Sequence, residues 1–245
     1  MKISNIQDLV PSSTKSNSSV ASRQDALEKF NSFNPATYAK TRNFLNGQIS
    51  RLSAHIKHGI ISNKEIYEHV RDKYAFNESE KFIQELAWRD FWRSYAYHHP
   101  DQLWTDVEEY KTGFQAQEYQ DELPEDIASA KTPTQVINVF IDQLLTTGYL
   151  HNHSRMYLAS YIVHFRRVKW QAGAKFFLSH LLDGDIASNN FSWQWIASTF
   201  AGKPYIFNLE NVHKYCHRSI EIIPEKNQEI DGSYEEISAR LFPNL

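Results

Sequence analysis

The chain has 245 residues, of which 41% are hydrophobic and 22% charged, values typical of a globular protein with a sizeable core, arranged as one large domain or two small ones. The single cysteine, Cys216, excludes an internal disulfide framework, a four-cysteine zinc site and an iron–sulfur cluster held by four cysteines of this chain. With a net charge of −3 the chain lacks the overall positive charge of many nucleic-acid binders, so any such binding requires a local basic patch.

The N-terminal region has the composition of a flexible arm. Residues 11–22 contain six serines and almost no apolar side chains, so we expect an arm over residues 1–25 and one domain over residues 26–245. No stretch approaches eighteen apolar residues, and the N-terminus has no apolar signal core, which predicts a cytoplasmic protein without membrane association.

The domain is predicted to be all-α. Residues 62–65, Ser-Asn-Lys-Glu, have the pattern of a capping box. Residues 132–135 predict a second helix start, with Pro133 at the first helical position and Gly148 closing the helix. Helical spacing with little strand alternation extends over the segments 81–98, 151–168, 171–182 and 187–200. The low glycine content and the absence of a dinucleotide-binding motif argue against a doubly wound α/β fold.

The segment 47–59 contains a candidate phosphate site. Ser50, Arg51 and Ser53 lie at a predicted helix start, where free backbone N–H groups, two hydroxyls and a cation would hold a phosphate or pyrophosphate. Simple serine capping of the helix is the alternative.

The segment 85–92 combines polar and aromatic residues on one helix face. Glu85, Trp88, Arg89 and Trp92 are spaced i, i+3, i+4 and i+7, a stripe suited to stacking and hydrogen-bonding flat rings in a cleft. The alternative is an ion pair between Glu85 and Arg89 beside packed indoles.

The segments 147–160 and 183–199 predict one further polar cluster. His151 and His153 are two apart and Arg155 would repel a cation, so we expect no metal here and instead an ion pair between Arg155 and Asp183. In the second segment Asp183, Asp185 and Asn189 can bond the polar edge of a bound ring, and a ligand-free buried polar network is the alternative. On a helix Trp193 and Trp195 face opposite ways, so one can face inward while the other lines a cavity.

Four motifs in order, "SRLS" at 50–53, "ELAWRDF" at 85–91, "TGYLHNHSRM" at 147–156 and "DGDIASNNFSWQW" at 183–195, resemble the FAD-binding catalytic domain of the DNA photolyase and cryptochrome family over about residues 36–210. The resemblance implies an all-α helical domain that holds FAD in a U shape at the bottom of a lesion-sized cavity. It implies two sets of cofactor contacts, a diphosphate set (Tyr38, Ser50, Arg51, Leu52, Ser53) and a second set (Arg89, Asn152, Arg155, Asp183, Asp185, Asn189), with Asn189 facing flavin N5.

The resemblance also implies DNA and electron-transfer residues. The lesion pocket corresponds to Glu85, Trp88, Asn152, Met156 and Trp195, and DNA contacts correspond to Arg42, Trp88, His153 and Trp195. The chain that photoreduces the flavin corresponds to Trp193 and Trp170, with the third position at Tyr110 by a looser match.

Three departures from the family pattern bear on function. The N-terminal antenna domain of full-length members is expected to be absent, and His153 replaces an arginine near the DNA cleft. Phe191 and Ser192 replace a Gly-Gly pair, which predicts a bulkier wall beside the flavin.

The function implied is light-driven repair of cyclobutane pyrimidine dimers by electron transfer from excited reduced FAD, with UV-damaged DNA, preferably single-stranded, as the partner. Asn152 and Met156 stand where (6-4) repair in the family uses histidines, which favours cyclobutane dimers as the lesion. A cryptochrome-type blue-light sensor without repair activity is the alternative, and a helical interaction protein without cofactor is a weaker one.

Overall fold

The computed structural model describes residues 22–200 and 202–245, so nearly all of the expected N-terminal arm lies outside the described residues. The described chain is helical, without a strand, as the sequence predicts. Its α-helices are α1 (Arg23–Ser32), α2 (Pro35–Thr41), α3 (Ser53–Lys57), α4 (Asn63–Lys73), α5 (Phe76–His98), α6 (Glu125–Ala128), α7 (Gln135–Thr147), α8 (Asn152–Ser160), α9 (Trp170–His180), α10 (Ile186–Ala197), α11 (Leu209–Cys216) and α12 (Tyr234–Leu241). A π-helix, η4 (Tyr161–Phe165), joins α8 to α9, and short 3₁₀ helices are η2 (Pro100–Leu103), η3 (Ala116–Glu118), η5 (Pro224–Lys226) and η6 (Gln228–Ile230).

Helix ends agree with the predicted signals in two places and differ in two. The Ser62 capping box is present at the start of α4, and Gly148 ends α7 with a φ of 66°. However, α7 begins at Gln135 and not at Pro133, because Thr132 turns back to bond Asn138 and leaves Thr134 as the N-cap. The first turn of α1, capped by Ser22, also occupies residues 23–25, which the sequence assigns to the arm.

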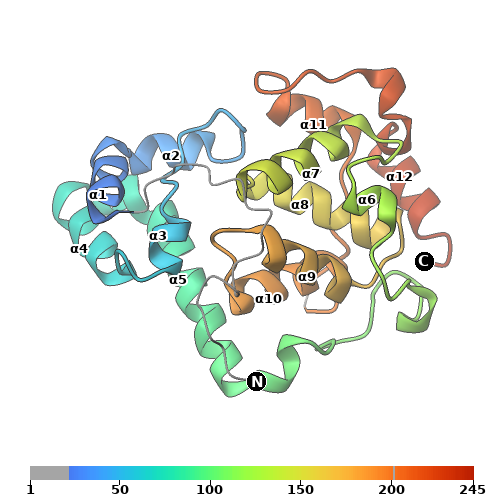
Figure 1. Ribbon diagram of the computed structural model, residues 1–245, viewed down its shortest axis with the longest axis horizontal. Helices are drawn as coiled ribbons and strands as arrows, with labels where there is room; N and C mark the ends of the chain where they lie inside the picture. The colour runs from blue at the N-terminus through green and yellow to red at the C-terminus, as the bar shows by residue number, and fades with distance from the viewer. Residues whose placement is uncertain (1–21, 201) are drawn as a thin grey trace, which may run out of the picture.

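The helices form two groups with separate hydrophobic cores. Figure 1 shows α1 to α4 together on one side of the molecule and α7, α8, α11 and α12 on the other. One core contains Phe30, Leu52 and Phe82, a larger one is built on α7 to α10 around Phe140 and Trp170, and a small third cluster lies at α12. Helix α5 packs against α2 and α4 in the first group and against α10 in the second, so it connects the two cores.

A glycine allows α9 and α10 to pack closely. A Cβ atom added to Gly173 would lie 2.2 Å from Cη2 of Trp193, a distance that no unstrained side chain tolerates. The missing side chain therefore makes room for the Trp193 indole, which is buried and packs edge-on against Phe177 at 4.9 Å.

Polar side chains of α10 fix the long connection that follows α5. Asn190 donates to the carbonyl of Leu103 at 2.7 Å, and Gln194 donates to the carbonyl of Gln102 at 2.8 Å. Gln194 also accepts from the backbone N–H of Val107 at 3.1 Å. These buried amides are satisfied by backbone groups, so part of the polar character of residues 183–199 serves the fold. Among the described residues, no helix is long and apolar enough to cross a membrane.

Candidate functional site

Two adjoining cavities lie where α5, α8 and α10 meet the segment before α3. Cavity A, of about 180 Å³, is enclosed mainly by α8 and α10 and by the loop that joins α9 to α10. Cavity B, of about 300 Å³, extends from it toward α2, the segment before α3, and α5. Both cavities share the lining residues Ser53, Arg89, Asn152, Ser188 and Ser192. The four sequence motifs, which are far apart in the chain, therefore line one continuous space.

The "SRLS" segment lines cavity B with strained backbone. Arg51 has a φ of 53°, in the left-handed region that non-glycine residues rarely adopt, and its guanidinium lies 5.6 Å from the ring centre of Tyr149. Such conformations cost about 1–3 kcal/mol and cluster at ligand sites, where successive N–H groups can converge on an anion. No serine side chain caps α3, whose N-cap is the buried Leu52. The capping alternative for these serines is therefore wrong.

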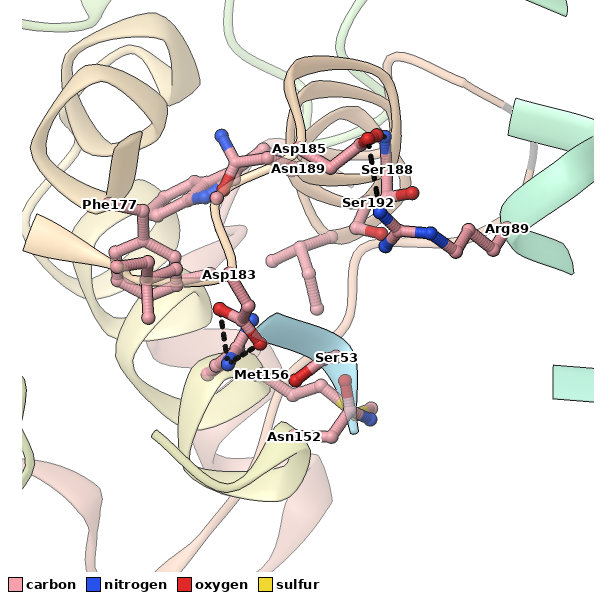
Figure 2. Close-up of a pocket in the computed structure, with 16 residues that line it drawn as sticks. Ser53, Arg89, Asn152, Met156, Phe177, Asp183, Asp185, Ser188, Asn189 and Ser192 are labelled. Atoms are coloured by element: carbon pink, nitrogen blue, oxygen red, sulfur yellow. Dashed lines mark hydrogen bonds and ion pairs between the residues drawn. The ribbon is translucent and has the colours of Figure 1, made fainter. Parts of the chain in front are cut away.

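The loop before α10 holds two acids that are each paired with arginine. Arg155 Nη2 donates to both oxygens of Asp183, at 3.0 and 2.8 Å, and Arg155 Nε donates to the carbonyl of Leu150. The predicted pair of Arg155 with Asp183 is therefore confirmed. Figure 2 shows these two contacts as dashed lines at Asp183, on one wall of cavity A.

Asp185 caps α10 and accepts from two arginines of α5. One of its oxygens accepts from the backbone N–H of Ser188 at 3.1 Å, and the other accepts from Arg89 at 3.3 Å and from Arg93 at 3.1 and 3.2 Å. Burial raises the pKa of Asp185, but the Ser188 hydrogen bond and the charges of Arg89 and Arg93 outweigh it and hold that pKa below its usual value. In Figure 2, Arg89 reaches from α5 toward Asp185 and Ser188.

The two tryptophans of α10 face opposite ways, as their spacing predicts. Trp193 is buried and lines cavity A, whereas Trp195 is 41% exposed and packs on Tyr205. Trp195 lines neither cavity, so the structure does not bring it together with the other residues expected in the lesion pocket. Asn189 lines cavity A, and its amide donates to the carbonyl of Ala174 at 3.2 Å.

Trp170, the second residue of the predicted electron-transfer chain, forms a stacked pair with a tryptophan that the sequence did not single out. Trp170 is buried and donates from Nε1 to Asp106 at 2.6 Å. Its ring stacks on Trp104, with centres 6.3 Å apart and planes 5° apart, and Trp104 is partly exposed. Tyr110 is buried and has no stacking contact with Trp170 among the described residues; it stacks instead on Tyr119. Both side chains therefore lie beside Trp170, and among the described residues it is Trp104 that makes the ring-to-ring contact.

The charged and aromatic face of α5 lines cavity B. Glu85, Trp88, Arg89 and Trp92 all face this cavity, as their spacing predicts. Glu85 does not pair with Arg89; it accepts from Arg42, and Lys81 lies 3.1 Å from it. The ion-pair alternative is therefore wrong.

The two histidines at the start of α8 are buried and neutral. Burial lowers the pKa of both His151 and His153 to about 4, with the charge of Arg42 acting in the same direction. The His153 ring packs edge-on against Tyr157 and Tyr215, at 4.8 and 4.7 Å. His153 is buried against these rings and lines neither cavity, so the structure gives no support to the DNA contact expected there.

The Phe191–Ser192 substitution affects the cavity less than the sequence predicts. Ser192 lines both cavities, but Phe191 lines neither, because its fully buried ring points to the far side of α10 and stacks on Trp92 at 5.5 Å. The predicted bulkier wall is therefore absent at Phe191.

Most residues assigned from the sequence meet at the cavities. Those in the lining of cavity A or B are Tyr38, Arg42, Ser50, Arg51, Leu52, Ser53, Glu85, Trp88, Arg89, Asn152, Arg155, Met156, Asp183, Asp185, Asn189 and Trp193. The sequence interpretation missed Arg93, Ser188 and Trp104. Arg93 lies one helical turn after Arg89 on α5, so its spacing was an available signal, but Trp104 has no periodic pattern around it.

Comparison with known proteins gives a consistent result. Residues 82–221 match the family model described as the FAD binding domain of DNA photolyase. A deoxyribodipyrimidine photo-lyase of Streptomyces griseus is 35% identical over 150 residues, which cover 61% of this chain and 32% of that protein.

Two solved structures resemble the fold. A class III photolyase from Agrobacterium tumefaciens has a TM-score of 0.70 at 25% identity, over 91% of this chain and 45% of that one. A photolyase from Sulfolobus tokodaii with two FAD molecules has a TM-score of 0.67 at 28% identity, over 79% and 44% of the two chains. The chain spans about a third of the length of the curated relatives it matches.

Proposed function

The chain belongs to the family of FAD-binding domains of DNA photolyase, and from this premise we propose that it carries out light-driven repair of cyclobutane pyrimidine dimers in DNA. The observation that carries the proposal is the continuous space of cavities A and B. One end has the strained, serine-rich Arg51 segment, and the other has the arginine-paired carboxylates of Asp183 and Asp185.

Polar atoms that lack partners support the fit of FAD to this space. Among the described residues, Arg89 Nε, Ser188 Oγ and Trp193 Nε1 are buried without a hydrogen-bond partner, and all three residues line cavity A. Leaving such groups unsatisfied costs about 1–3 kcal/mol each, so a polar ligand that bonds them is stabilising. Ser50, Arg51 and Ser53 would hold the diphosphate, and Asp183, Asp185 and Asn189 would bond the polar edges of the flavin and its side chain.

When bound, reduced FAD supplies the excited-state electron that splits the dimer, and the electron returns after the ring opens. The protein residues bind and orient the lesion. Trp88, half-exposed at cavity B, offers a face for stacking of the flipped bases. Asn152 and Met156 line cavity A, which adjoins cavity B, and the Asn152 amide lies 3.7 Å from the Met156 sulfur. Glu85, in the lining of cavity B, can accept a hydrogen bond from a base N–H.

We further propose that Trp193, Trp170 and Trp104 relay electrons from the surface to cavity A. Trp193 would pass an electron to the group bound in cavity A, and Trp170 would then reduce the oxidised Trp193. The oxidised site would end on Trp104, which stacks on Trp170 and is partly exposed. Tyr110 is less suited, because oxidation of a phenol releases its proton and the buried Tyr110 hydroxyl has no acceptor for it among the described residues. Burial, and then the nearby charge of Asp106, also raise the pKa of Tyr110.

We propose a preference for single-stranded DNA on the basis of charge. The chain has a net charge of −3, His153 is neutral, and the charge of Arg42 is partly offset by Glu85. Flipping a pyrimidine dimer out of a duplex costs a few kcal/mol that a single strand largely avoids. Few cations at the cavity mouth are free to compensate that cost through phosphate contacts.

The test is repair of an oligonucleotide carrying one cyclobutane dimer, alone and annealed, in light and in darkness. We expect yellow, FAD-containing protein, repair only in light, and faster repair of the single strand. Protein that binds FAD and photoreduces it without repairing dimers would instead be the cryptochrome-type sensor. Repair of a (6-4) photoproduct without repair of cyclobutane dimers would contradict the lesion assignment.

A further inference from the structure

Helix α5 continues as an aromatic surface beyond cavity B. Trp88, Phe91, Trp92 and Tyr95 follow one face at i, i+3, i+4 and i+7, and we define these four residues as the α5 stripe. Trp88 and Trp92 are stacked with ring centres 5.6 Å apart, and Phe91 lies edge-on to them at 5.4 and 5.0 Å. Trp88 is 51% exposed and Phe91 is 44% exposed, so the stripe presents open ring surface to solvent.

The stripe is held rigid from behind by residues of α10 and its C-terminal end. Trp92 stacks on the buried Phe191 with planes 17° apart, and Tyr95 packs edge-on against Phe191 at 5.0 Å. Phe200 packs edge-on against both Trp92 and Tyr95 at 5.3 Å. Phe191 thus supports the stripe and not the cavity, and the exposed rings of Trp88 and Phe91 lose little conformational entropy on binding.

The stripe is continuous with the proposed lesion site. Trp88 and Trp92 line cavity B, whereas Phe91 lies outside both cavities, three residues after Trp88 on the same helix face. A base bound against Trp88 at the cavity mouth therefore has Phe91 as the next exposed ring for its neighbour in the strand.

Two acids beside the stripe are each paired with two cations. Glu85 is paired with both Arg42 and Lys81, and Asp185 is paired with both Arg89 and Arg93. Each of these two carboxylates thus lies between two cations, and the Arg93 side chain is 47% exposed. The exposed Arg93 guanidinium gives this end of the stripe a cation that suits the phosphates of a polyanion.

We propose that the α5 stripe is a stacking platform for the unpaired bases that flank the lesion in single-stranded DNA, with Phe91 as its outer ring. The inference rests on the proposed function and deepens it. Every base has a π-face, so stacking of this kind tolerates any flanking sequence. In a duplex those faces are covered by neighbouring pairs, so the stripe also gives a structural reason for single-strand preference.

The test is the affinity of the full chain for a labelled, undamaged 16-nucleotide oligothymidine, measured by fluorescence anisotropy. We expect Phe91→Ala to weaken single-strand binding about five- to tenfold, within the range for loss of one base–aromatic stack. Phe91→Leu retains apolar bulk without a π-face and should lose a similar factor, which separates stacking from a folding defect. Tyr97→Ala is the matched control: Tyr97 is 82% exposed on the opposite side of α5, and its removal should change affinity less than twofold.

Equal affinities of the Phe91 and Tyr97 variants would overturn the inference, and so would a parent protein that forms dimers which Phe91→Ala dissociates. Light-driven repair by the parent, together with unchanged binding by Phe91→Ala, would refute the platform and leave the proposed function standing. A parent that neither binds the oligonucleotide nor repairs dimers would refute both.

Discussion

Arg155 and Asp183 form an ion pair in which one guanidinium nitrogen lies within 3.0 Å of both carboxylate oxygens. Asp183 is nearly inaccessible to solvent, and Arg155 is about three-quarters covered. A pair this covered leaves a costly uncompensated charge when one partner is removed, so it fixes the wall of cavity A.

Asp183→Ala is expected to release most of the FAD, because it removes a polar contact and leaves Arg155 unpaired. The measurement is the ratio of flavin to protein absorbance after gel filtration, together with the urea midpoint of the flavin-free protein. Removal of one partner should destabilise the fold by about 2–4 kcal/mol. Asp121→Ala, which breaks the exposed pair of Lys169 with Asp121, is the control and should change neither value appreciably. Full flavin content in Asp183→Ala would contradict the assignment.

Photoreduction should depend on Trp104 and not on Tyr110. Trp193→Phe and Trp104→Phe should each slow light-driven flavin reduction at least tenfold while FAD stays bound, because a phenyl ring is much harder to oxidise than an indole. Tyr110→Phe should reduce at close to the parent rate. The measurement is the decay of the oxidised-flavin absorbance under blue light with an external reductant. The opposite ranking of Trp104 and Tyr110 would restore the assignment made from the sequence.

Stability should fall between pH 7 and pH 5. Burial lowers the pKa of His151, His153 and His164 to about 4, below their unfolded value near 6.5. The unfolded chain therefore binds more protons in this window, so the free energy of unfolding decreases as pH falls, by about 1–2 kcal/mol per histidine. Urea midpoints at the two pH values measure the effect.

His153→Gln supplies the matched comparison for that pH effect. It removes one titrating group, so the difference in unfolding free energy between pH 7 and pH 5 should shrink by about 1–2 kcal/mol, whatever the absolute stability of the variant. A difference identical to that of the parent would show that His153 titrates normally in the folded protein.

Gly173→Ala should destabilise the protein by clashing with the outer ring of Trp193. The added Cβ would lie 2.2 to 3.0 Å from three carbons of that ring. Overpacking of this kind costs about 1–3 kcal/mol, and thermal melting should detect it. Trp193→Phe removes those carbons, so the double variant should be more stable than the sum of the single effects predicts. Strict additivity would show that the clash is relieved elsewhere.

The sequence predicted the helical class and most of the cavity lining because these depend on periodic or local patterns. The spacing of Glu85, Trp88, Arg89 and Trp92 on α5 was sufficient to place them on one face. The pairing of Glu85 with Arg42 was not predictable, because Arg42 approaches from the C-terminal end of α2, a helix that no periodic pattern links to α5.

The position of Trp104 shows the limit of motif counting. Trp104 lies in an irregular connection that is fixed by backbone hydrogen bonds to Asn190 and Gln194, more than 80 residues later. The spacing of residues along the chain does not contain that constraint, and the prediction of Tyr110 as the third electron-transfer position rested on such spacing alone. The same holds for Phe191, whose direction depends on Trp92 and Phe200 and not on its neighbours in sequence.

The π-helix η4 has a consequence for tolerance of insertions and deletions. A π turn accommodates one residue more than an α turn, and an α-helix rotates about 100° per residue. Arg155 before η4 faces cavity A, while Trp170 after it stacks on Trp104. Deleting one residue within Tyr161–Phe165 would let the segment close as an ordinary α-helix and rotate the rest of that segment by about 100° relative to α8. The inward direction of the buried side chains Ile162, Val163 and His164 thus depends on a single extra residue, and a one-residue deletion there should lower the melting temperature even where the helices still form.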